Sequence, residues 1–318
     1  MNQSRQSFEV LYNDFNEKLQ KKEYENSLLL IPQLLEIANN EIDIFYTLMG
    51  KASALTSLNE QDEVLDTYDE IINRFKSSKD KSIIRFLAYA YYNKALIYAK
   101  QKNYKKEIKV YNSLLENYIE DTSSELEIVL VKTYLNKAIC VNEIEGSHKS
   151  ISIYKELAKN FESSVSEEVL EYVVQALYNV ASIYAQHDEN EESIKAYDYL
   201  ISKFEDNQNN LIQEHIAKSL VNKASRLSDL NKNKDALKTY DKVVTGFEES
   251  NDKIKKQVAI ALHNKSILLS TLNEEKKLLE TCDLIIEKFI NSKDELIANI
   301  VSSAQVIKDK DRFNNNSF

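Results

Sequence analysis

Aromatic side chains recur along the chain with one long period. A tyrosine column and a phenylalanine-rich column each repeat about every 43 residues and lie seven residues apart. Seven residues make two helical turns, so both columns fall on one face of the same helix. We predict that this face is buried in every unit. The columns consist of Tyr68, Tyr111, Tyr154, Tyr197, Tyr240 and Cys282, and of Phe75, Tyr118, Phe161, Phe204, Phe247 and Phe289.

A polar column keeps the same period in the segments between the aromatic helices. Its asparagines are spaced 43, 43, 43 and 42 residues apart, at Asn93, Asn136, Asn179, Asn222 and Asn264. A fixed interval of this length indicates an array of helical repeats. Each unit is therefore predicted to contain a first helix, which carries the asparagine, and a second helix, which carries the aromatic columns.

Helix-start patterns give the expected boundaries. Capping boxes are predicted at Thr122, Ser164 and Ser292, and single caps at Asn210 and Asp252. Six repeats follow, at about 41–79, 80–121, 122–163, 164–207, 208–249 and 250–290. We expect a diverged helix pair at 1–40, which Pro32 should kink or delay, a capping helix at 291–310 and a disordered tail at 311–318.

The composition favours helices throughout. Only three glycines and one proline occur, whereas the tight turns of β-hairpins need residues that reach positive φ. Apolar residues make up 43% of the chain, which is enough to build a folded core. Cys140 and Cys282 lie in different units, so we expect buried free thiols in a reducing compartment.

Charge and hydropathy indicate which partners and which cellular location to expect. The formal net charge is −10 and both signs are interleaved, which does not fit a surface that follows nucleic-acid phosphates. The N-terminal residues lack the apolar core of a signal peptide, and charged residues interrupt the most apolar run, 83–99. We therefore expect no nucleic-acid partner, no membrane segment and a cytoplasmic location.

Within a unit, asparagine, small and aromatic residues follow a fixed order. The second unit has Asn93, Ala95, Tyr98, Tyr104 and Tyr111, and later second helices carry small residues at Ser150, Ser193 and Ala236. This order resembles the tetratricopeptide repeat, in a longer, bacterial-type variety of about 43 residues in place of the usual 34. The resemblance implies an all-α fold, an α-solenoid in which helix pairs stack as a right-handed superhelix with the first helices on the concave wall.

Polar side chains form a narrow stripe on the predicted first helices. They recur at spacings of four, three and four, which keeps them on one helical face between apolar neighbours. Burying such groups unpaired costs about 1–3 kcal/mol each, so we expect the stripe to face solvent or a ligand. The predicted peptide- or partner-binding residues are Tyr89, Asn93, Lys132, Asn136, Glu143, Gln175, Asn179, Ser182, Gln186, Lys218, Asn222, Ser225, Asp229 and Asn264.

The asparagines allow two interpretations. In similar repeat proteins, asparagines at this position hold the backbone of an extended peptide, because an amide both donates and accepts. Alternatively, each asparagine hydrogen-bonds the neighbouring repeat and sets the stacking angle. Lys132 with Asn136, and Lys218 with Asn222, also resemble the pair with which chaperone adaptors hold a C-terminal carboxylate.

Residues for catalysis are not assembled in the sequence. The histidines, His148, His187, His215 and His263, fall in separate units without metal-ligand spacing, and we expect them at the surface. There is no glycine-rich phosphate loop, nucleophile elbow or zinc-binding histidine pair. We therefore predict no enzyme activity, no metal and no cofactor.

Two non-catalytic functions follow. In the first, the protein is a scaffold or adaptor that binds a peptide or a flexible segment of a partner protein in its concave groove. In the second, it is a structural or regulatory subunit that docks a folded partner, or a second copy of itself, through its convex face or edges. The sequence leaves the identity of the partner and the oligomeric state open.

Overall fold

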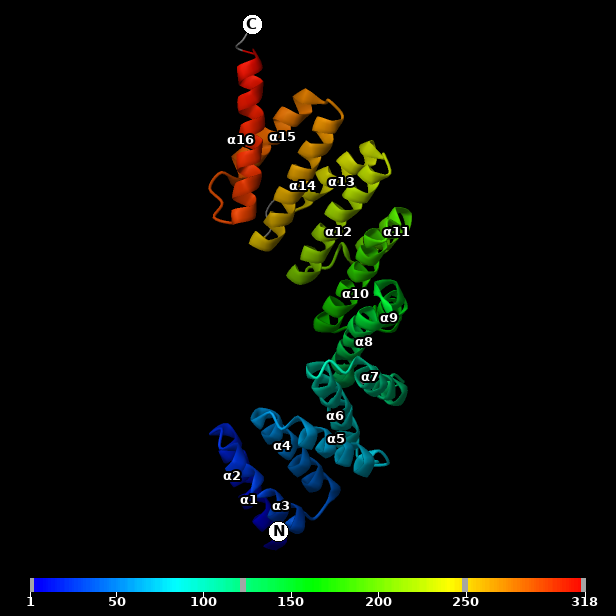
Figure 1. Cartoon of the computed structure of the whole chain (residues 1–318), viewed down its shortest axis with the longest axis vertical. Coiled ribbons are helices and arrows are strands. Elements are labelled where there is room, and N and C mark those ends of the chain that lie inside the picture. The colour runs from blue at the N-terminus through cyan, green and yellow to red at the C-terminus, as the bar shows by residue number, and fades with distance from the viewer. Residues whose placement is uncertain (1–2, 121–123, 248–250, 316–318) are drawn as a thin grey trace. The chain divides into compact units, whose positions relative to one another are not determined.

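Every regular element that the structure describes is an α-helix. A computed structural model describes residues 3–120, 124–247 and 251–315, and Figure 1 shows its helices in chain order. The all-α prediction is confirmed. The helices are α1 (Gln3–Gln20), α2 (Tyr24–Leu28), α3 (Ile31–Ile37), α4 (Glu41–Leu58), α5 (Gln61–Phe75), α6 (Lys81–Lys100), α7 (Tyr104–Tyr118), α8 (Ser124–Glu145), α9 (Ser147–Phe161), α10 (Glu167–Gln186), α11 (Asn190–Phe204), α12 (Asn210–Asp229), α13 (Asn233–Gly246), α14 (Asp252–Thr271), α15 (Glu275–Phe289) and α16 (Glu295–Asn315).

The chain forms two compact units, residues 1–153 and residues 154–318. In unit 1, each helix from α4 to α7 packs on the next one, and the first helices α4, α6 and α8 also contact in turn. Unit 2 repeats this pattern: α10 to α16 pack in order, and α10, α12, α14 and α16 contact in turn. Each unit is thus a stack of helical hairpins, as expected for an α-solenoid.

The aromatic columns form the core of these stacks, as predicted. Tyr111 and Tyr197 are at most 1% exposed, and every other member of the two columns is also buried. Cys140 and Cys282 are buried free thiols, which confirms the expectation for both.

The turn inside each hairpin contains one residue with left-handed backbone geometry. Only one of these residues is a glycine, Gly146. The others are Lys22, Asn59, Lys102, Asp188, Asn231 and Asn273, with φ between 53° and 63°. Side chains in this conformation cost about 1–2 kcal/mol, so packing of the two helices has to hold each turn in place.

Two helix starts lie two residues later than predicted. Ser166 caps α10 and Asp294 caps α16, because their side chains accept the free backbone N–H groups of the first turn. The predicted caps, Ser164 and Ser292, instead accept the backbone N–H of Ser166 and Asp294. The serine and the true cap therefore form one turn, and the prediction chose the outer of two polar residues.

Two other starts lie one residue earlier than predicted. Asn209 caps α12 and Asn251 caps α14, in place of Asn210 and Asp252. In both pairs the first polar residue takes the extended backbone that lets its side chain reach the helix amides. The capping box predicted at Thr122 lies outside the described residues.

The helices at the two ends of the chain were predicted with different success. Pro32 interrupts the second predicted helix of the N-terminal pair, which is divided into α2 and α3 with the proline in the first turn of α3. At the other end, α16 continues to Asn315, so the part of the expected disordered tail from 311 to 315 is helical instead. This stretch contains no glycine or proline that would end the helix. Residues 316–318 lie outside the described part of the chain.

Gly50 allows α1 and α4 to approach closely. A Cβ atom at this position would overlap the ring edge of Phe15, which is completely buried. By contrast, a Cβ atom at Gly246, the last residue of α13, would meet no atom within 4 Å.

We therefore expect Gly50→Ala to lower the free energy of unfolding by about 1–3 kcal/mol, because the ring must move out of a packed core. Gly246→Ala, the matched control, should be neutral or stabilising by up to about 1 kcal/mol, because alanine favours the helix. Urea denaturation followed by circular dichroism measures both. Equal effects of the two substitutions would contradict the close approach of α1 and α4.

Candidate protein-interaction site

All fourteen predicted binding residues lie on first helices, and most are half-buried. Glu143, Gln186 and Asp229 are exposed, and the remaining ones have intermediate exposure. Tyr89, Asn93, Lys132, Asn136 and Glu143 belong to unit 1, whereas the others belong to unit 2.

The asparagine amides bind tyrosine hydroxyls of the preceding hairpin. Asn222 Nδ2 donates to the hydroxyls of Tyr197, at 3.2 Å, and Tyr178, at 2.9 Å. Asn136 Nδ2 donates in the same way to the Tyr92 hydroxyl at 3.1 Å. The tyrosine column is hydrogen-bonded similarly in three further pairs, Asn93 with Tyr68, Asn179 with Tyr154 and Asn264 with Tyr240.

These contacts match the second interpretation of the asparagine column, in which the amide bonds the neighbouring repeat. Burial raises the pKa of Tyr197 to about 12, and the bond from Asn222 opposes part of this rise. The hydroxyl accepts a hydrogen bond from the amide, which suits a buried neutral group. A ligand contact through the remaining amide atoms stays a prediction.

An ion pair accompanies most of these hydrogen bonds. The lysine that follows the asparagine pairs with the aspartate that follows the tyrosine, for example Lys265 Nζ with Asp241 Oδ1 at 2.6 Å. The same pair joins Lys94 to Asp69, Lys223 to Asp198 and Lys308 to Asp283. The lysines are largely covered and the aspartates are half exposed, so each pair contributes up to about 1 kcal/mol.

Sequence reasoning did not identify this aspartate column. Its signal was present, because an Asp follows the tyrosine column 24 or 25 residues before a Lys that follows the asparagine column. Lys308 lies on α16 and pairs with Asp283 of α15. The terminal helix therefore occupies the position that a further first helix would take.

Among the interfaces between the hairpins from α4 to α16, two cannot form the ion pair. Asn112 replaces the aspartate opposite Lys137, and Lys155 and Val180 replace both partners at the next interface. Each of these interfaces carries a different arrangement, a buried carboxyl group at the first and an apolar groove at the second.

The buried carboxyl group belongs to Glu107 of α7. It is only 2% exposed, and its Oε2 atom is buried without a hydrogen-bond partner among the described residues. Other units have Ser150, Ser193 or Ala236 at this position. Burial raises the pKa of Glu107, and a hydrogen bond with the Cys140 thiol opposes this rise. Burial also raises the pKa of Cys140, which keeps this thiol protonated and unreactive.

One pocket on unit 2 collects several predicted residues. It lies on the first-helix side of unit 2, defined as the surface of α10, α12 and α14, and has a volume of about 370 Å³. Ser225 and Asp229 of α12 line it together with Asn264 and Thr271 of α14. The Ser225 and Tyr240 hydroxyls lie 3.1 Å apart at the pocket. Residues of the polar stripe from two neighbouring first helices, α12 and α14, thus line the same polar cavity.

Lys218 does not offer a free positive charge with which to hold the C-terminal carboxylate of a partner. Its Nζ pairs with Glu214 Oε1 on the same helix at 2.6 Å, so a carboxylate of the chain already neutralises it.

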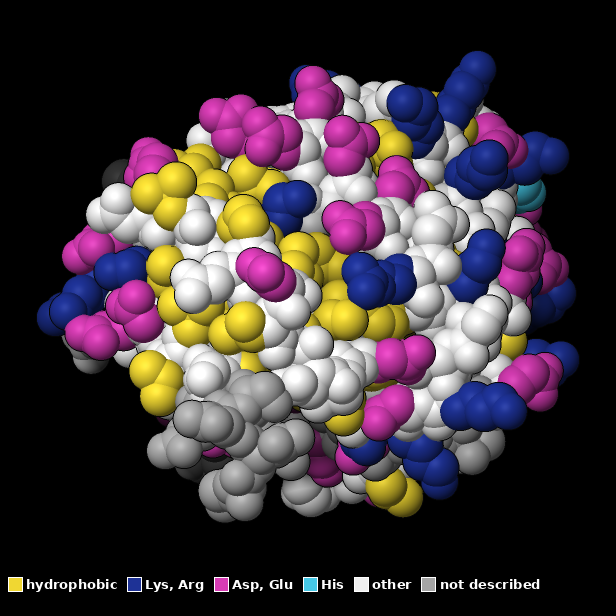
Figure 2. Space-filling view, turned by 90° about the horizontal axis from the view of Figure 1, so that it is seen from below, with side chains coloured by type: hydrophobic (Ala, Val, Ile, Leu, Met, Phe, Trp, Pro, Cys, Tyr) yellow, Lys and Arg dark blue, Asp and Glu magenta, His cyan; other side chains and the backbone are white. Residues whose placement is uncertain are grey.

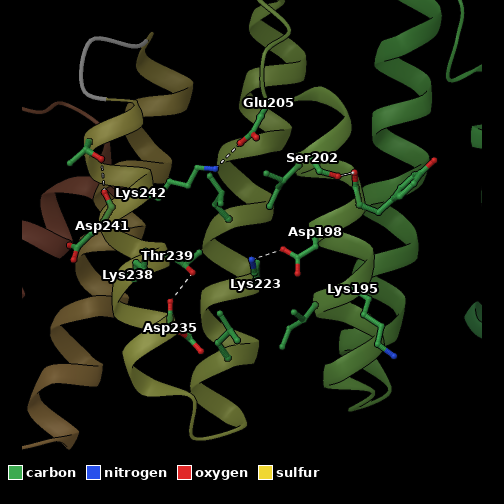
Figure 3. Close-up of a pocket in the computed structure, with 16 residues that line it drawn as sticks. Lys195, Asp198, Ser202, Glu205, Lys223, Asp235, Lys238, Thr239, Asp241 and Lys242 are labelled. Atoms are coloured by element: carbon green, nitrogen blue, oxygen red, sulfur yellow. Dashed lines mark hydrogen bonds and ion pairs between the residues drawn. The ribbon is translucent and has the colours of Figure 1, made fainter.

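A larger groove lies on the second-helix side of unit 2, defined as the surface of α11, α13 and α15 with the last turns of α9. It has a volume of about 1080 Å³, lies between α11 and α13, and has α12 as its floor. Figure 3 shows Lys223 and Asp198 paired across it and Lys242 bonded to Glu205 above them. A similar groove of about 570 Å³, between α13 and α15, contains the Lys265 and Asp241 pair.

The described part of the chain contains no cluster suited to metal chemistry. No three His, Cys, Asp or Glu side chains within it are grouped closely enough to hold a metal ion. His148 and His187 are exposed as expected, but His215 and His263 are half-buried, which corrects the prediction for these two. His215 packs edge-on against Tyr178, and burial lowers its pKa.

The surface carries charged side chains of both signs. Figure 2 shows Lys and Arg side chains mixed with Asp and Glu on the face it presents. Over the described residues, no helix combines the length and the apolar content that crossing a bilayer requires.

A family model for the tetratricopeptide repeat matches residues 89–118. This match begins within α6 and ends with α7, so it covers one hairpin and leaves out the first turns of α6. Residues 89–118 therefore match one tetratricopeptide repeat. The residues of α6 before Tyr89 extend the first helix of this tetratricopeptide repeat beyond the matched region.

Two solved structures share the helical-repeat fold with this chain at low sequence identity. The apo form of RapI has a TM-score of 0.56 at 15% identity, over 92% of this chain and 79% of RapI. A signal-transduction ATPase with a tetratricopeptide-repeat sensor, from Pyrococcus horikoshii, has a TM-score of 0.51 at 14% identity, over 97% of this chain and 50% of the ATPase. No curated protein matches the sequence.

The hydrogen bond between hairpins can be measured by a double-mutant cycle. Asn222→Ala should lower the free energy of unfolding by about 1–3 kcal/mol, because it removes the amide donor from two tyrosine hydroxyls. In a Tyr197→Phe background the same substitution should cost at least about 0.5 kcal/mol less, since one of these hydroxyls is absent. Denaturant titration of the four proteins measures the coupling. Additive effects would contradict the bond.

Glu107 should make stability depend on pH. Its pKa is raised in the folded state, so the folded chain binds more protons than the unfolded chain. Stability should therefore fall as pH rises from the ordinary carboxyl pKa through the raised folded value, and then stay low. Glu107→Gln should raise the free energy of unfolding by about 1–3 kcal/mol near neutral pH, and change little at low pH.

Thermal unfolding across a pH series measures this difference between the two proteins. Glu116→Gln is the matched control, because Glu116 is exposed on the same helix. Its pH profile should follow that of the unmodified protein. A constant stability difference between Glu107→Gln and the unmodified protein at all pH values would contradict a buried, titrating Glu107.

Proposed function

We propose that this protein is a non-catalytic scaffold that binds a peptide or a flexible segment of a partner protein on the first-helix side of unit 2. Tetratricopeptide repeats generally form protein-interaction folds, which supports protein binding as the general role. The observation that favours this side is the polar pocket in which Ser225, Asp229 and Asn264 lie together.

The pocket suits a polypeptide backbone. It offers an amide, hydroxyl groups and a carboxylate, which together supply donors and acceptors for peptide N–H and C=O groups. Ile267 adds an apolar surface and is 53% exposed. A cavity of about 370 Å³ holds one or two side chains, and neighbouring residues of an extended segment would follow the stripe along the first helices.

The asparagines alone cannot test this proposal, because their amides also hold the hairpins together. Asp229 and Thr271 are better positions, since both are exposed and both line the pocket. Asp229 pairs with Arg226 of the same helix, at 3.1 Å, and not with a neighbouring hairpin. Substitutions there should leave the stack intact.

We expect Asp229→Ala with Thr271→Ala to weaken partner binding at least tenfold while the midpoint of thermal unfolding stays unchanged. The partner would be captured from an extract of the native host and identified by mass spectrometry, and its affinity measured by calorimetry. A photo-crosslinking residue at Thr271 should then label the partner, whereas one at the exposed neighbour Ser270, on another face of α14, should not.

The alternative function, docking of a folded partner through the second-helix side, predicts a different result. Crosslinking would then come from Thr239, which lines the groove between α11 and α13. Unchanged affinity of the double variant together with crosslinking from Thr239 would contradict binding on the first-helix side. A stable self-assembly in light scattering would favour a structural subunit.

A further inference from the structure

The groove between α9 and α11 differs from the other second-helix-side grooves. It has a volume of about 380 Å³, and its floor consists of Leu177, Val180 and Tyr184 from α10. Val180 stands where the neighbouring interfaces have Lys223 and Lys265. The lysine that crosses those grooves to reach an aspartate is therefore replaced by an apolar side chain.

The missing ion pair leaves this groove open and apolar. Leu177 and Val180 are nearly covered by packing, at 6% and 2% exposure, so the floor is rigid. Tyr199 forms one wall and is 47% exposed, an unusual exposure for a large aromatic side chain. A volume of about 380 Å³ falls in the range of pockets that hold a side-chain-sized ligand.

The groove has a positive rim in a chain of net charge −10. Lys155, Lys159 and Lys195 line it together with Glu162 and Glu192. Both carboxylates are already bound within the chain: Glu192 pairs with Lys195 at 2.6 Å, and Glu162 accepts from Tyr199 and Lys203.

Two lysine charges on the rim are not matched by a carboxylate among the described residues. Lys155 Nζ donates to the neutral hydroxyl of Tyr184 at 3.0 Å and lies 5.2 Å from the centre of that ring. Lys159 is exposed. Exposed lysines around an apolar floor favour a ligand that carries negative charge beside an apolar group.

We propose that this groove binds an acidic segment of a partner protein by inserting one aromatic or large aliphatic side chain between α9 and α11. The apolar side chain packs on Leu177, Val180 and Tyr199, and flanking carboxylates pair with Lys155 and Lys159. An apolar anchor in a rigid pocket with charged surroundings is the usual arrangement of an interface hot spot. This surface is separate from the pocket of Ser225, Asp229 and Asn264, so it adds a second binding site.

The test uses a fluorescein-labelled peptide with a Phe-Leu pair flanked on both sides by glutamates. Fluorescence anisotropy should show saturable binding to the full-length protein. Replacing the glutamates by lysines, or the Phe-Leu pair by serines, should weaken binding at least tenfold. Asp229→Ala with Thr271→Ala should bind this peptide normally, which distinguishes the result from a test of the first-helix-side pocket.

The repeat itself supplies the decisive variants. Val180→Lys with Lys155→Asp installs the ion pair of the neighbouring interfaces, so it should keep or raise stability and weaken peptide binding at least tenfold. Lys223→Val with Asp198→Lys transfers the open arrangement to the groove between α11 and α13, and should add a second equivalent of bound peptide. Lys159→Glu, a surface change, should weaken binding in a protein whose fold is not at risk.

Several outcomes would overturn the proposal. One is that the acidic peptide shows no saturable binding, and another is that the lysine-flanked peptide binds equally well. Unchanged peptide binding by the double variant Val180→Lys with Lys155→Asp, together with unchanged binding by Lys159→Glu, would also contradict the proposal. Displacement of the peptide by phosphatidylserine vesicles or by a single-stranded oligonucleotide would indicate that the groove binds another anionic ligand and not a protein segment. Light scattering that shows a dimer, lost in Lys159→Glu, would place a second copy of the chain in the groove.

Discussion

The hydrogen bond from an asparagine amide to a buried tyrosine hydroxyl of the preceding hairpin is the interaction on which the stack depends. Leaving such a hydroxyl unpaired costs about 1–3 kcal/mol, and the asparagine that supplies the bond lies on the next first helix. A single hairpin is therefore incomplete until its neighbour packs on it. At the last interface, Cys282 and Ile307 stand at the tyrosine and asparagine positions, so the series ends without an unpaired tyrosine.

The Lys–Asp ion pair beside this hydrogen bond varies more between hairpin interfaces than the hydrogen bond does. It is half exposed where it occurs, so its loss at one interface costs little and leaves the stack intact. The two interfaces without it carry the unusual groups of the molecule, the buried Glu107 and the apolar groove at Val180. Sequence variation between the hairpins is thus found where the fold tolerates it.

The structural role of the asparagines changes how a binding surface should be sought. A polar stripe on the first helices suggests ligand contact, yet much of its hydrogen-bonding capacity is used between hairpins. The residues left for a partner are the exposed ones at the pocket edge, Asp229 and Thr271 among them. Separating these from the amides makes partner binding testable without unfolding the stack.

The all-α class, the two helices of each unit and the buried aromatic columns could be predicted from the sequence alone, because periodicity directly records which face of a helix is covered. The sequence also contains Tyr-Asp followed by Asn-Lys at an interval of 24 or 25 residues in three units, a signal that the sequence analysis did not use. Only the tertiary structure decided that these dipeptides meet, since the contact joins different hairpins. Helix caps were misplaced by one or two residues because several polar residues compete there, and backbone conformation selects one. The grooves likewise depend on side chains from three helices, which no local pattern specifies.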